Sequence, residues 1–151
     1  RKMRGPSFQP FTVTVFNTHF YHLFDSPKPE FNRRTVYRAN VITGRDPLLD
    51  CFDCPSPSVA TPQRRTTITP TQALALMNDS FVLRQSRLFA ARVKESAGED
   101  VVEQIDRAFQ LALTRQPTRQ EHTQMLTLIR EHDLSSACWV LLNSSEFLYS
   151  N

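Results

Sequence analysis

Residues 66–80 read Thr-Thr-Ile-Thr-Pro-Thr-Gln-Ala-Leu-Ala-Leu-Met-Asn-Asp-Ser, and the character of the chain changes at this run. Thr69 suits the N-cap of a helix, Pro70 suits the first helical position, and Gln72 completes the Thr-x-x-Gln pattern of a capping box. Five apolar residues follow before a polar pair, so the run predicts a short helix over 70–77. We expect regular helices after this run and mostly irregular structure before it.

The sequence after this run predicts a small antiparallel bundle of about five helices, which makes the fold mainly α. Helix-start patterns recur at Asp100, Thr118 and Asp133. Gly98 suits the end of a helix that begins near Ser80. The short connections between successive helices favour antiparallel neighbours. The residues that we expect in the core of the bundle include Ile105, Phe109 and Trp139.

The N-terminal part, residues 1–69, is predicted to be an irregular wrapping segment rich in aromatic residues and proline. The alternating, β-branched stretch 11–16 is typical of a short strand, and a short helix is favoured over an extended piece at 33–41. Burying a phenylalanine side chain contributes roughly 1.5–3 kcal/mol. The segment is therefore expected to wrap over the bundle, to dock on an upstream domain, or both. Its phenylalanines are Phe8, Phe11, Phe16, Phe20, Phe24 and Phe31, six of the eleven in the chain.

Length and composition favour one domain overall, in which 70–151 form the bundle. A chain of 151 residues is long enough for a sizeable core. It starts at Arg1 without an initiator methionine or a signal peptide, so we expect the C-terminal fragment of a longer protein. No apolar run is long enough to span a bilayer, and no transmembrane segment is expected.

Charge is distributed unevenly along the chain. The net charge of +3 is weak for a nucleic-acid-binding protein, so nucleic acid is not expected as a partner. Residues 1–45 hold eight basic and two acidic side chains, whereas residues 99–151 hold four basic and eight acidic ones. This asymmetry indicates either a basic binding face or complementarity between the two ends of the chain.

The three cysteines do not make a disulfide framework or a complete zinc site. Cys51 and Cys54 have Cys-x-x-Cys spacing, but Pro55 stands where haem attachment requires a histidine. We expect this pair to form a local disulfide or to remain two free thiols, and to bind neither haem nor a tightly held metal. Cys138 lies in an apolar helical stretch beside Trp139 and is expected to be a small buried hydrophobe.

Two sets of residues are candidate binding sites. His19, His22 and Asp25 are spaced by three, which would bring three metal ligands to one helical face, and the alternative is a pair of packed, hydrogen-bonded histidines. Clustered arginines are suited to carboxylate, sulfate or phosphate, because guanidinium groups bind these anions through two parallel hydrogen bonds. The arginines concerned are Arg33, Arg34, Arg38, Arg64 and Arg65.

The alternative, which the sequence favours, is that these arginines form ion pairs with carboxylates of the same chain. The nearby carboxylates are Glu30, Asp46, Asp50 and Asp53. We expect Arg34 in particular to pair with a buried carboxylate, in which case its loss would be strongly destabilising. Asp50, Asp53 and Glu146 are candidates for hydrolytic chemistry by residue type alone, so no catalytic residue is predicted.

Three blocks of the chain carry a resemblance to a known family. They are Glu30-Phe-Asn-Arg-Arg-Thr-Val-Tyr-Arg38, then Pro47-Leu-Leu-Asp-Cys-Phe-Asp-Cys-Pro55 through Thr69-Pro-Thr-Gln-Ala-Leu-Ala-Leu-Met-Asn78, then Ala108-Phe-Gln-Leu-Ala-Leu-Thr-Arg-Gln-Pro-Thr118 with Leu142-Asn-Ser-Ser-Glu-Phe-Leu-Tyr149. In this order they resemble the planctomycete-type C-terminal domain of unknown function. The resemblance implies a position downstream of a c-type haem domain in a large exported protein. It supplies no catalytic residue.

The function expected from these observations is a non-catalytic structural or interaction module of an envelope-associated planctomycete protein. Its partners would be the upstream domains of the same polypeptide, and its location would be exported, periplasmic or in the cell envelope. No cofactor is expected in this chain, although haem c would be bound upstream. The alternative is a binding or hydrolytic module for acidic or sulfated polysaccharide, with the arginines as the anion contacts.

Overall fold

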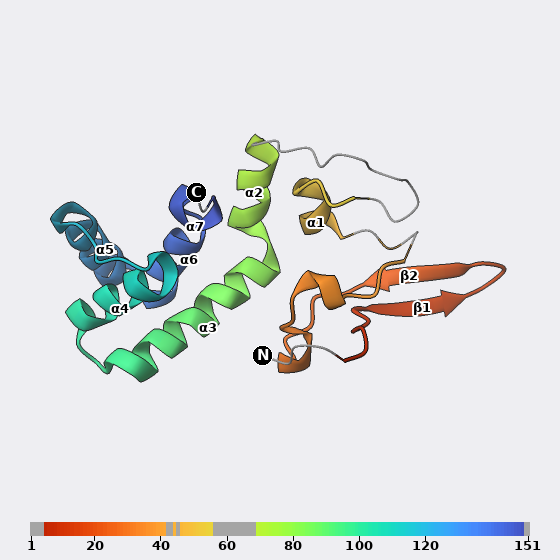
Figure 1. Cartoon of the computed structure of the whole chain (residues 1–151), viewed down its shortest axis with the longest axis horizontal. Helices are drawn as coiled ribbons and strands as arrows, with labels where there is room; N and C mark the ends of the chain where they lie inside the picture. Colours follow the sequence, from red (N-terminus) through yellow and green to blue (C-terminus); the bar gives the residue numbers. More distant parts are fainter. Residues whose placement is uncertain (1–4, 42–43, 45, 56–68, 150–151) are drawn as a thin grey trace. The chain divides into compact units, whose positions relative to one another are not determined.

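The computed structural model describes residues 5–41, 44, 46–55 and 69–149 (Figure 1). The chain divides into two compact units, Arg1–Ala75 and Leu76–Asn151, which we call the N-terminal and C-terminal units. The division falls inside helix α2 (Pro70–Asn78) rather than immediately before it. Each unit is described separately below.

The helix start that opened the sequence analysis forms as predicted. The backbone N–H of Gln72 donates to Thr69 Oγ1 at 3.3 Å, and the backbone N–H of Thr69 donates to Gln72 Oε1 at 3.3 Å. This reciprocal pair is the capping box. After a break, Asp79 accepts from the N–H of Phe81 and starts the long helix α3 (Ser80–Ala97), which ends at Gly98 with φ 72°.

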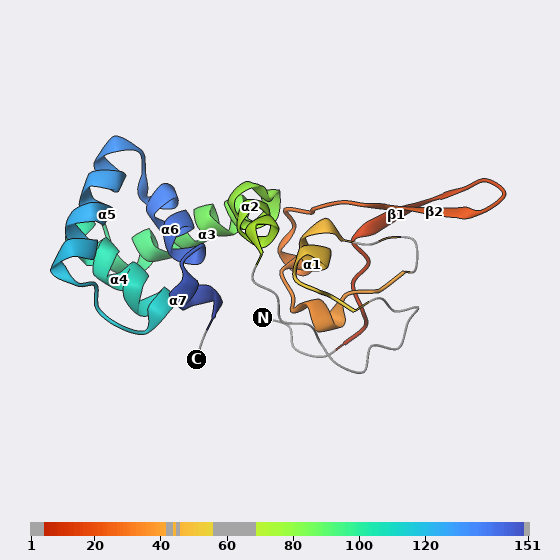
Figure 2. The same cartoon turned by 90° about the horizontal axis from the view of Figure 1, so that it is seen from above.

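Four more helices follow in the C-terminal unit, and the first three begin where the start patterns predicted. They are α4 (Val101–Leu113), α5 (Arg119–Glu131), α6 (Leu134–Leu142) and α7 (Ser145–Leu148). Asp100 and Asp133 cap α4 and α6, and Thr118 forms a full capping box with Glu121 at the start of α5. The mainly α fold is therefore confirmed (Figure 2).

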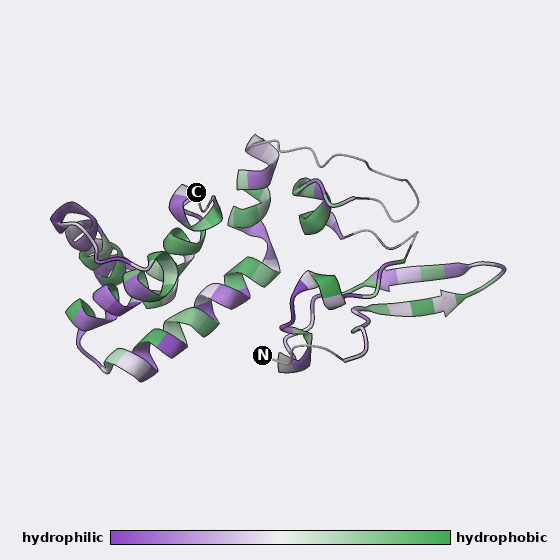
Figure 3. Ribbon diagram, in the orientation of Figure 1, coloured by the Kyte–Doolittle hydropathy of each residue, from purple (hydrophilic) through white to green (hydrophobic). Residues whose placement is uncertain are grey.

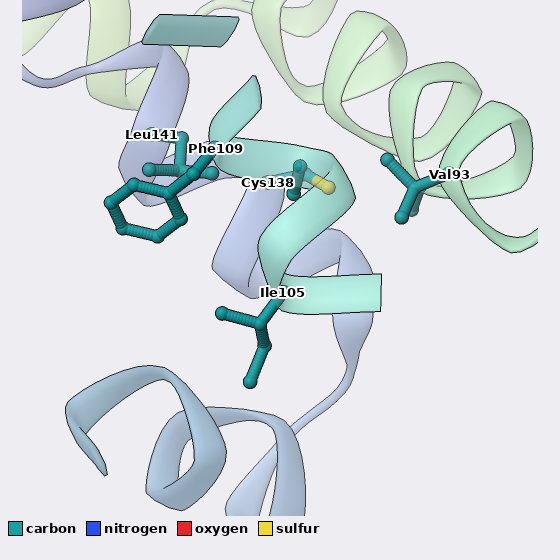
Figure 4. Packing of buried hydrophobic residues seen from close by; sticks show 7 residues of the cluster. Val93, Ile105, Phe109, Cys138 and Leu141 are labelled. Carbon is teal, nitrogen blue, oxygen red and sulfur yellow. The ribbon is translucent and has the colours of Figure 1, made fainter. Parts of the chain in front are cut away.

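The core of the C-terminal unit lies between α3, α4 and α6, with α5 packed against α4 and α6. Ile105 and Phe109 are 2% and 1% exposed, which confirms their predicted place in the core (Figure 4). Trp139 is half-buried, and its indole Nε1 has no hydrogen-bond partner among the described residues. The buried cluster consists of Ala90, Val93, Ile105, Ala108, Phe109, Cys138 and Leu141.

The N-terminal unit contains the predicted strand as part of a two-stranded hairpin. Strands β1 (Phe11–Val15) and β2 (His19–Leu23) pair antiparallel, with Phe11 opposite Leu23 and Val15 opposite His19. Two 3-10 turns, η1 (Pro29–Phe31) and η2 (Thr35–Tyr37), and the short helix α1 (Pro47–Cys51) follow.

The expected short helix at 33–41 is wrong. Only the single 3-10 turn η2 forms there, and Arg38 is extended with φ −76° and ψ 133°. The reason is that Phe8, which lies outside this segment, forms backbone hydrogen bonds with it. Phe8 donates its N–H to the carbonyl of Tyr37 at 3.0 Å and accepts from the N–H of Ala39 at 2.8 Å, which holds this stretch in a parallel β-bridge.

Some of the early aromatic residues pack against one another inside the N-terminal unit. The Phe31 ring meets Phe8 and Phe24 edge to face at centroid distances of 5.9 and 5.8 Å, and Phe11 meets Tyr21 at 5.2 Å. Such edge-to-face pairs are the favoured arrangement of aromatic rings. Phe16, by contrast, is 82% exposed at the end of the hairpin.

Candidate functional site

Arg33 is held by aromatic rings and a backbone carbonyl. Its guanidinium carbon lies 4.7 Å from the Tyr37 ring centroid and 6.0 Å from that of Phe8. Arg33 Nη1 donates to the carbonyl of Pro6 at 2.8 Å. A guanidinium stacked in this way is favourable for both the charge and the ring. Arg33 therefore braces the aromatic cluster of the N-terminal unit.

Arg38 takes the internal partner that the sequence analysis favoured. Its Nη1 donates to Asp46 Oδ2, and both side chains are partly buried. Asp46 is also the N-cap of α1, where its Oδ1 accepts from the N–H groups of Leu48 at 2.9 Å and Leu49 at 3.2 Å. One carboxylate thus fixes the start of α1 and neutralises Arg38.

The remaining arginines of the predicted set do not join this pair. Arg34 is exposed, and no ion pair to it is formed within the described residues, so its expected pairing with a buried carboxylate is wrong. It lies at the N-cap of η2 and turns its side chain to solvent. Arg64 and Arg65 lie outside the described residues.

A cavity of about 240 Å³ lies beside the Arg38–Asp46 pair. Its only described cationic lining group is Arg38, which is already neutralised, so an anionic ligand would have to displace the Asp46 carboxylate. The described part of the lining therefore offers no second cation for sulfate or phosphate. It is lined by Thr35, Val36, Arg38, Asn40, Gly44, Asp46, Leu49, Asp50, Cys54 and Pro55.

The candidate metal ligands His19, His22 and Asp25 are not brought together on one helical face. Both histidines lie on β2, and residues three apart on a strand point to opposite faces of a sheet. The helical spacing that motivated the prediction therefore does not apply. Among the described residues, no three His, Cys, Asp or Glu side chains are grouped so that they could hold a metal ion.

All three cysteines are free thiols. Cys51 ends α1, Cys54 follows the turn after it, and both thiols are half-buried and not joined in a disulfide. Cys138 is completely buried, and burial raises the pKa of its thiol to about 12. A thiol with so high a pKa is a poor nucleophile. Cys138 therefore packs as a small hydrophobe, as predicted.

Arg115, which the sequence analysis did not single out, is a charged group with several partners in the C-terminal unit. Its guanidinium donates to both oxygens of Glu146 at 2.7 Å and to the two oxygens of Glu121 at 2.7 and 3.0 Å. Its carbon also lies 5.5 Å from the Phe109 ring centroid. We call Arg115, Glu121 and Glu146 the arginine clamp. It ties the end of α4 to the start of α5 and to α7.

The electrostatics of the arginine clamp favour a fully ionised state. The hydrogen bond from Arg115, followed by that from the backbone N–H of Thr118, lowers the pKa of Glu121 to about 2. Arg115 likewise lowers the pKa of Glu146, and the two carboxylates raise the pKa of Arg115. All three groups are charged at neutral pH. The clamp is suited to holding helices together rather than to transferring protons.

The clamp predicts that the C-terminal unit loses stability in acid. The pKa of Glu121 is about 2 in the folded chain and about 4.3 in an unfolded one. Its contribution is therefore complete above the unfolded value and is lost as pH falls from about 5 towards 2. Thermal unfolding followed by Trp139 fluorescence across this window measures the loss. An Arg115→Gln variant should have a lower melting temperature at neutral pH and a flatter dependence on pH. If the melting temperatures of the two proteins fall in parallel as pH is lowered, the arginine clamp does not cause the loss of stability in acid.

Comparison with protein families matches residues 1–129 to the family described as PSD1, a protein of unknown function (DUF1553). The chain belongs to this family. No curated protein and no solved structure matches it. The predicted resemblance to a domain of unknown function is confirmed at this level, and the family description assigns no activity. In this member of the DUF1553 family, no helix in the described residues combines the length and apolarity needed to cross a membrane.

Large apolar side chains of this DUF1553 chain remain exposed in both units. Figure 3 shows how hydrophobic and hydrophilic residues alternate along the ribbon of each element. On α3, Phe81 and Leu88 are 40% and 47% exposed, and they lie two turns apart on a different side of the helix from the buried residues Val82, Ser86 and Val93. In the hairpin, the exposed apolar side chains are Val13, Val15, Phe16 and Phe20. The sequence analysis expected the early phenylalanines to be covered by the bundle, by an upstream domain, or by both.

Proposed function

We propose that this chain is a non-catalytic interaction module of a longer multidomain protein. The observation that carries the proposal is the row of Phe81 and Leu88 on α3, which adds an exposed apolar side to a helix that already has a buried one. Contiguous exposed apolar surface is typical of sites that contact another protein, and Phe81 and Leu88 are the residues on α3 that we propose for such a contact. The upstream domains of the same polypeptide are the partners that we propose for it.

The charged groups support the same function. Arg38 is neutralised by Asp46, and Arg115 is neutralised by Glu121 and Glu146. These pairs fasten secondary-structure elements within each unit, so their chemistry is used in holding the fold. On the apolar side of α3, Phe81 contacts the Arg84 guanidinium at 5.4 Å from its ring centroid, and both Phe81 and Leu88 remain substantially exposed.

The setting of the longer protein is a further part of the proposal. We place it among exported, envelope-associated planctomycete proteins with a c-type haem domain upstream. This part rests on the three sequence blocks that resemble that family. Reading the gene upstream of Arg1 tests it, because a haem domain requires a Cys-x-x-Cys-His attachment motif. The absence of such a motif from the gene would exclude a c-type haem domain upstream, but it would not affect the proposal of an interaction module.

The interaction module is tested by changing the apolar side of α3. The double variant Phe81→Gln, Leu88→Gln should bind less of a hydrophobic dye and less of the separately expressed upstream domains. Its melting temperature should change little, because both side chains are substantially exposed. The exposed Arg92→Gln on the same helix is the matched control. Unchanged binding by the double variant would exclude this surface as the contact.

Arg34→Ala separates the interaction module from the alternative of a module that binds sulfated or acidic polysaccharide. Because Arg34 is exposed and its ion pair is not formed, we expect its loss to change the free energy of unfolding by less than about 0.5 kcal/mol. Binding to heparin-like glycans should be equally weak before and after the change. A stable Arg34→Ala protein that has lost measurable glycan binding would favour the polysaccharide module instead.

A further inference from the structure

Strand β1 is an edge strand of the two-stranded sheet in the described part of the chain. The N–H of Phe24 donates to the carbonyl of Pro10 at 3.0 Å, and that of Phe16 donates to the carbonyl of Thr18 at 3.1 Å. Because backbone groups alternate in direction along an antiparallel strand, these two bonds point the even-numbered residues of β1 toward β2. The N–H and C=O groups of Phe11, Val13 and Val15 therefore point away from β2. In the described part of the chain, the sheet has no third strand to receive them.

This edge lacks the features that normally protect edge strands. From Ser7 to Phe24 the sequence contains no Asp, Glu, Lys or Arg, and β1 itself contains no proline. Natural proteins usually place lysine, proline or a bulge on an exposed edge to prevent pairing with another chain. A hairpin of two strands is also marginally stable in water without further strands or a packed face. Residues Thr12–Val15 are exposed, so the hairpin gains little from packing there.

The sequence of β1 is complementary to itself in antiparallel pairing. With a two-fold axis through Val13, Phe11 of one copy faces Val15 of the other, and Val13 faces its own counterpart. Thr12 and Thr14 face each other on the opposite side of the sheet. Aromatic with β-branched residues, and threonine with threonine, are favourable cross-strand pairs. The same register sets the outward-pointing N–H and C=O groups of all three odd-numbered residues against those of the partner copy.

We propose that β1 is a dimerisation edge, through which two copies of this chain pair Phe11–Val15 antiparallel about a two-fold axis at Val13. The two hairpins then form one four-stranded sheet, which meets the usual requirement for an independently stable sheet. An interface in which each copy presents the same patch is the commonest form of homodimer. The inference rests on the proposed function of an interaction module and names a second copy as one of its partners. Because one strand edge is smaller than a standard interface, the dimer dissociates on dilution.

Charge exchange at Val13 tests both the partner and the register. Val13 is 45% exposed, so lysine or glutamate fits at this position in a single copy. In the dimer, Val13→Lys sets two lysines against each other across the axis, and Val13→Glu sets two glutamates against each other, which is unfavourable for directly opposed residues. Each variant alone is expected to be monomeric at concentrations where the unchanged 151-residue chain is dimeric. An equimolar mixture of the two is expected to regain the dimer. Val13→Thr, which keeps both the strand propensity and the charge, is the matched control and should dimerise.

Sedimentation equilibrium over a range of concentrations gives the result, and thermal melts of each variant report whether it is folded. Restoration in the mixture is diagnostic, because two misfolded variants would not rescue each other. An unchanged chain that is monomeric throughout, a dimer retained by both charge variants, or a mixture that stays monomeric overturns the proposal. A monomeric chain that sediments with phospholipid vesicles also overturns the proposal, because the β1 edge would then contact lipid. The dye and upstream-domain measurements on the α3 double variant are independent of Val13. If the chain is monomeric but the α3 double variant still shows reduced dye and upstream-domain binding, the dimer is excluded and the interaction module is supported.

Discussion

Phe109→Ala is expected to lower the free energy of unfolding of the C-terminal unit by about 3–5 kcal/mol, the usual range for truncating a buried phenylalanine. Phe109 is 1% exposed and lies in the cluster shared by α3, α4 and α6. Its ring also lies beneath the Arg115 guanidinium, at 5.5 Å from the ring centroid. Removing the ring therefore opens a cavity and takes away one support of the arginine clamp.

Urea unfolding followed by Trp139 fluorescence measures this loss, because Trp139 is the single tryptophan of the chain and lies on α6 of the same unit. Val102→Ala is a matched control on the same helix, since Val102 is 46% exposed. Its cost should be below about 1 kcal/mol, as for a surface position. Equal costs for the two variants would show that the buried stripe of α4 is assigned wrongly.

The helix boundaries of the C-terminal unit could be predicted because their signals are local. A capping side chain and the N–H that it accepts from are two or three residues apart, so Thr69, Asp100, Thr118 and Asp133 carry the information for their own helix starts. The periodic apolar stripe of α4 is equally local, and it identified Ile105 and Phe109 as core residues.

The features that the sequence analysis missed or predicted wrongly depend on contacts between residues distant in sequence. Arg115 and Glu146 are separated by 31 residues, and their contact exists only because α4 and α7 pack together. The helix expected at 33–41 is replaced by an extended stretch because Phe8 supplies backbone hydrogen bonds from outside it. The capping box that includes Glu121 was visible in the sequence, but its second role as a ligand of Arg115 was not.

The candidate metal site at His19 and His22, which the sequence analysis set against packed histidines, depends on the period assigned to the segment. Spacing by three brings His19 and His22 to one side of a helix, whereas in a strand it separates them onto two faces. The neighbouring β-branched stretch already favoured a strand, and the hairpin extends that conformation through His22. A candidate metal site is therefore only as good as the secondary structure assigned to its ligands.

Asp46→Ala is expected to have the largest effect on the N-terminal unit. It removes the N-cap of α1, which contributes about 0.5–2 kcal/mol, and the charge-assisted hydrogen bond from Arg38, which contributes about 1.5–3 kcal/mol. The side chains of Arg38 and Asp46 are only 15% and 28% exposed, so water replaces the lost partner poorly. The expected total is about 2–5 kcal/mol if the two contributions add. NMR signals of Tyr21 and Tyr37 report unfolding of this unit, while Trp139 reports the other.

Asp46→Asn separates the two contributions, because asparagine is as good an N-cap as aspartate but carries no charge. It should retain the hydrogen bonds to Leu48 and Leu49 and lose the ionic part of the contact with Arg38. The asparagine variant is therefore expected to be intermediate between the original chain and Asp46→Ala. In a chain that already carries Arg38→Met, the further change Asp46→Asn should cost much less, because the two residues act as one interacting pair. Additive costs would show that the cap alone fixes α1 and that Arg38 is held by something else.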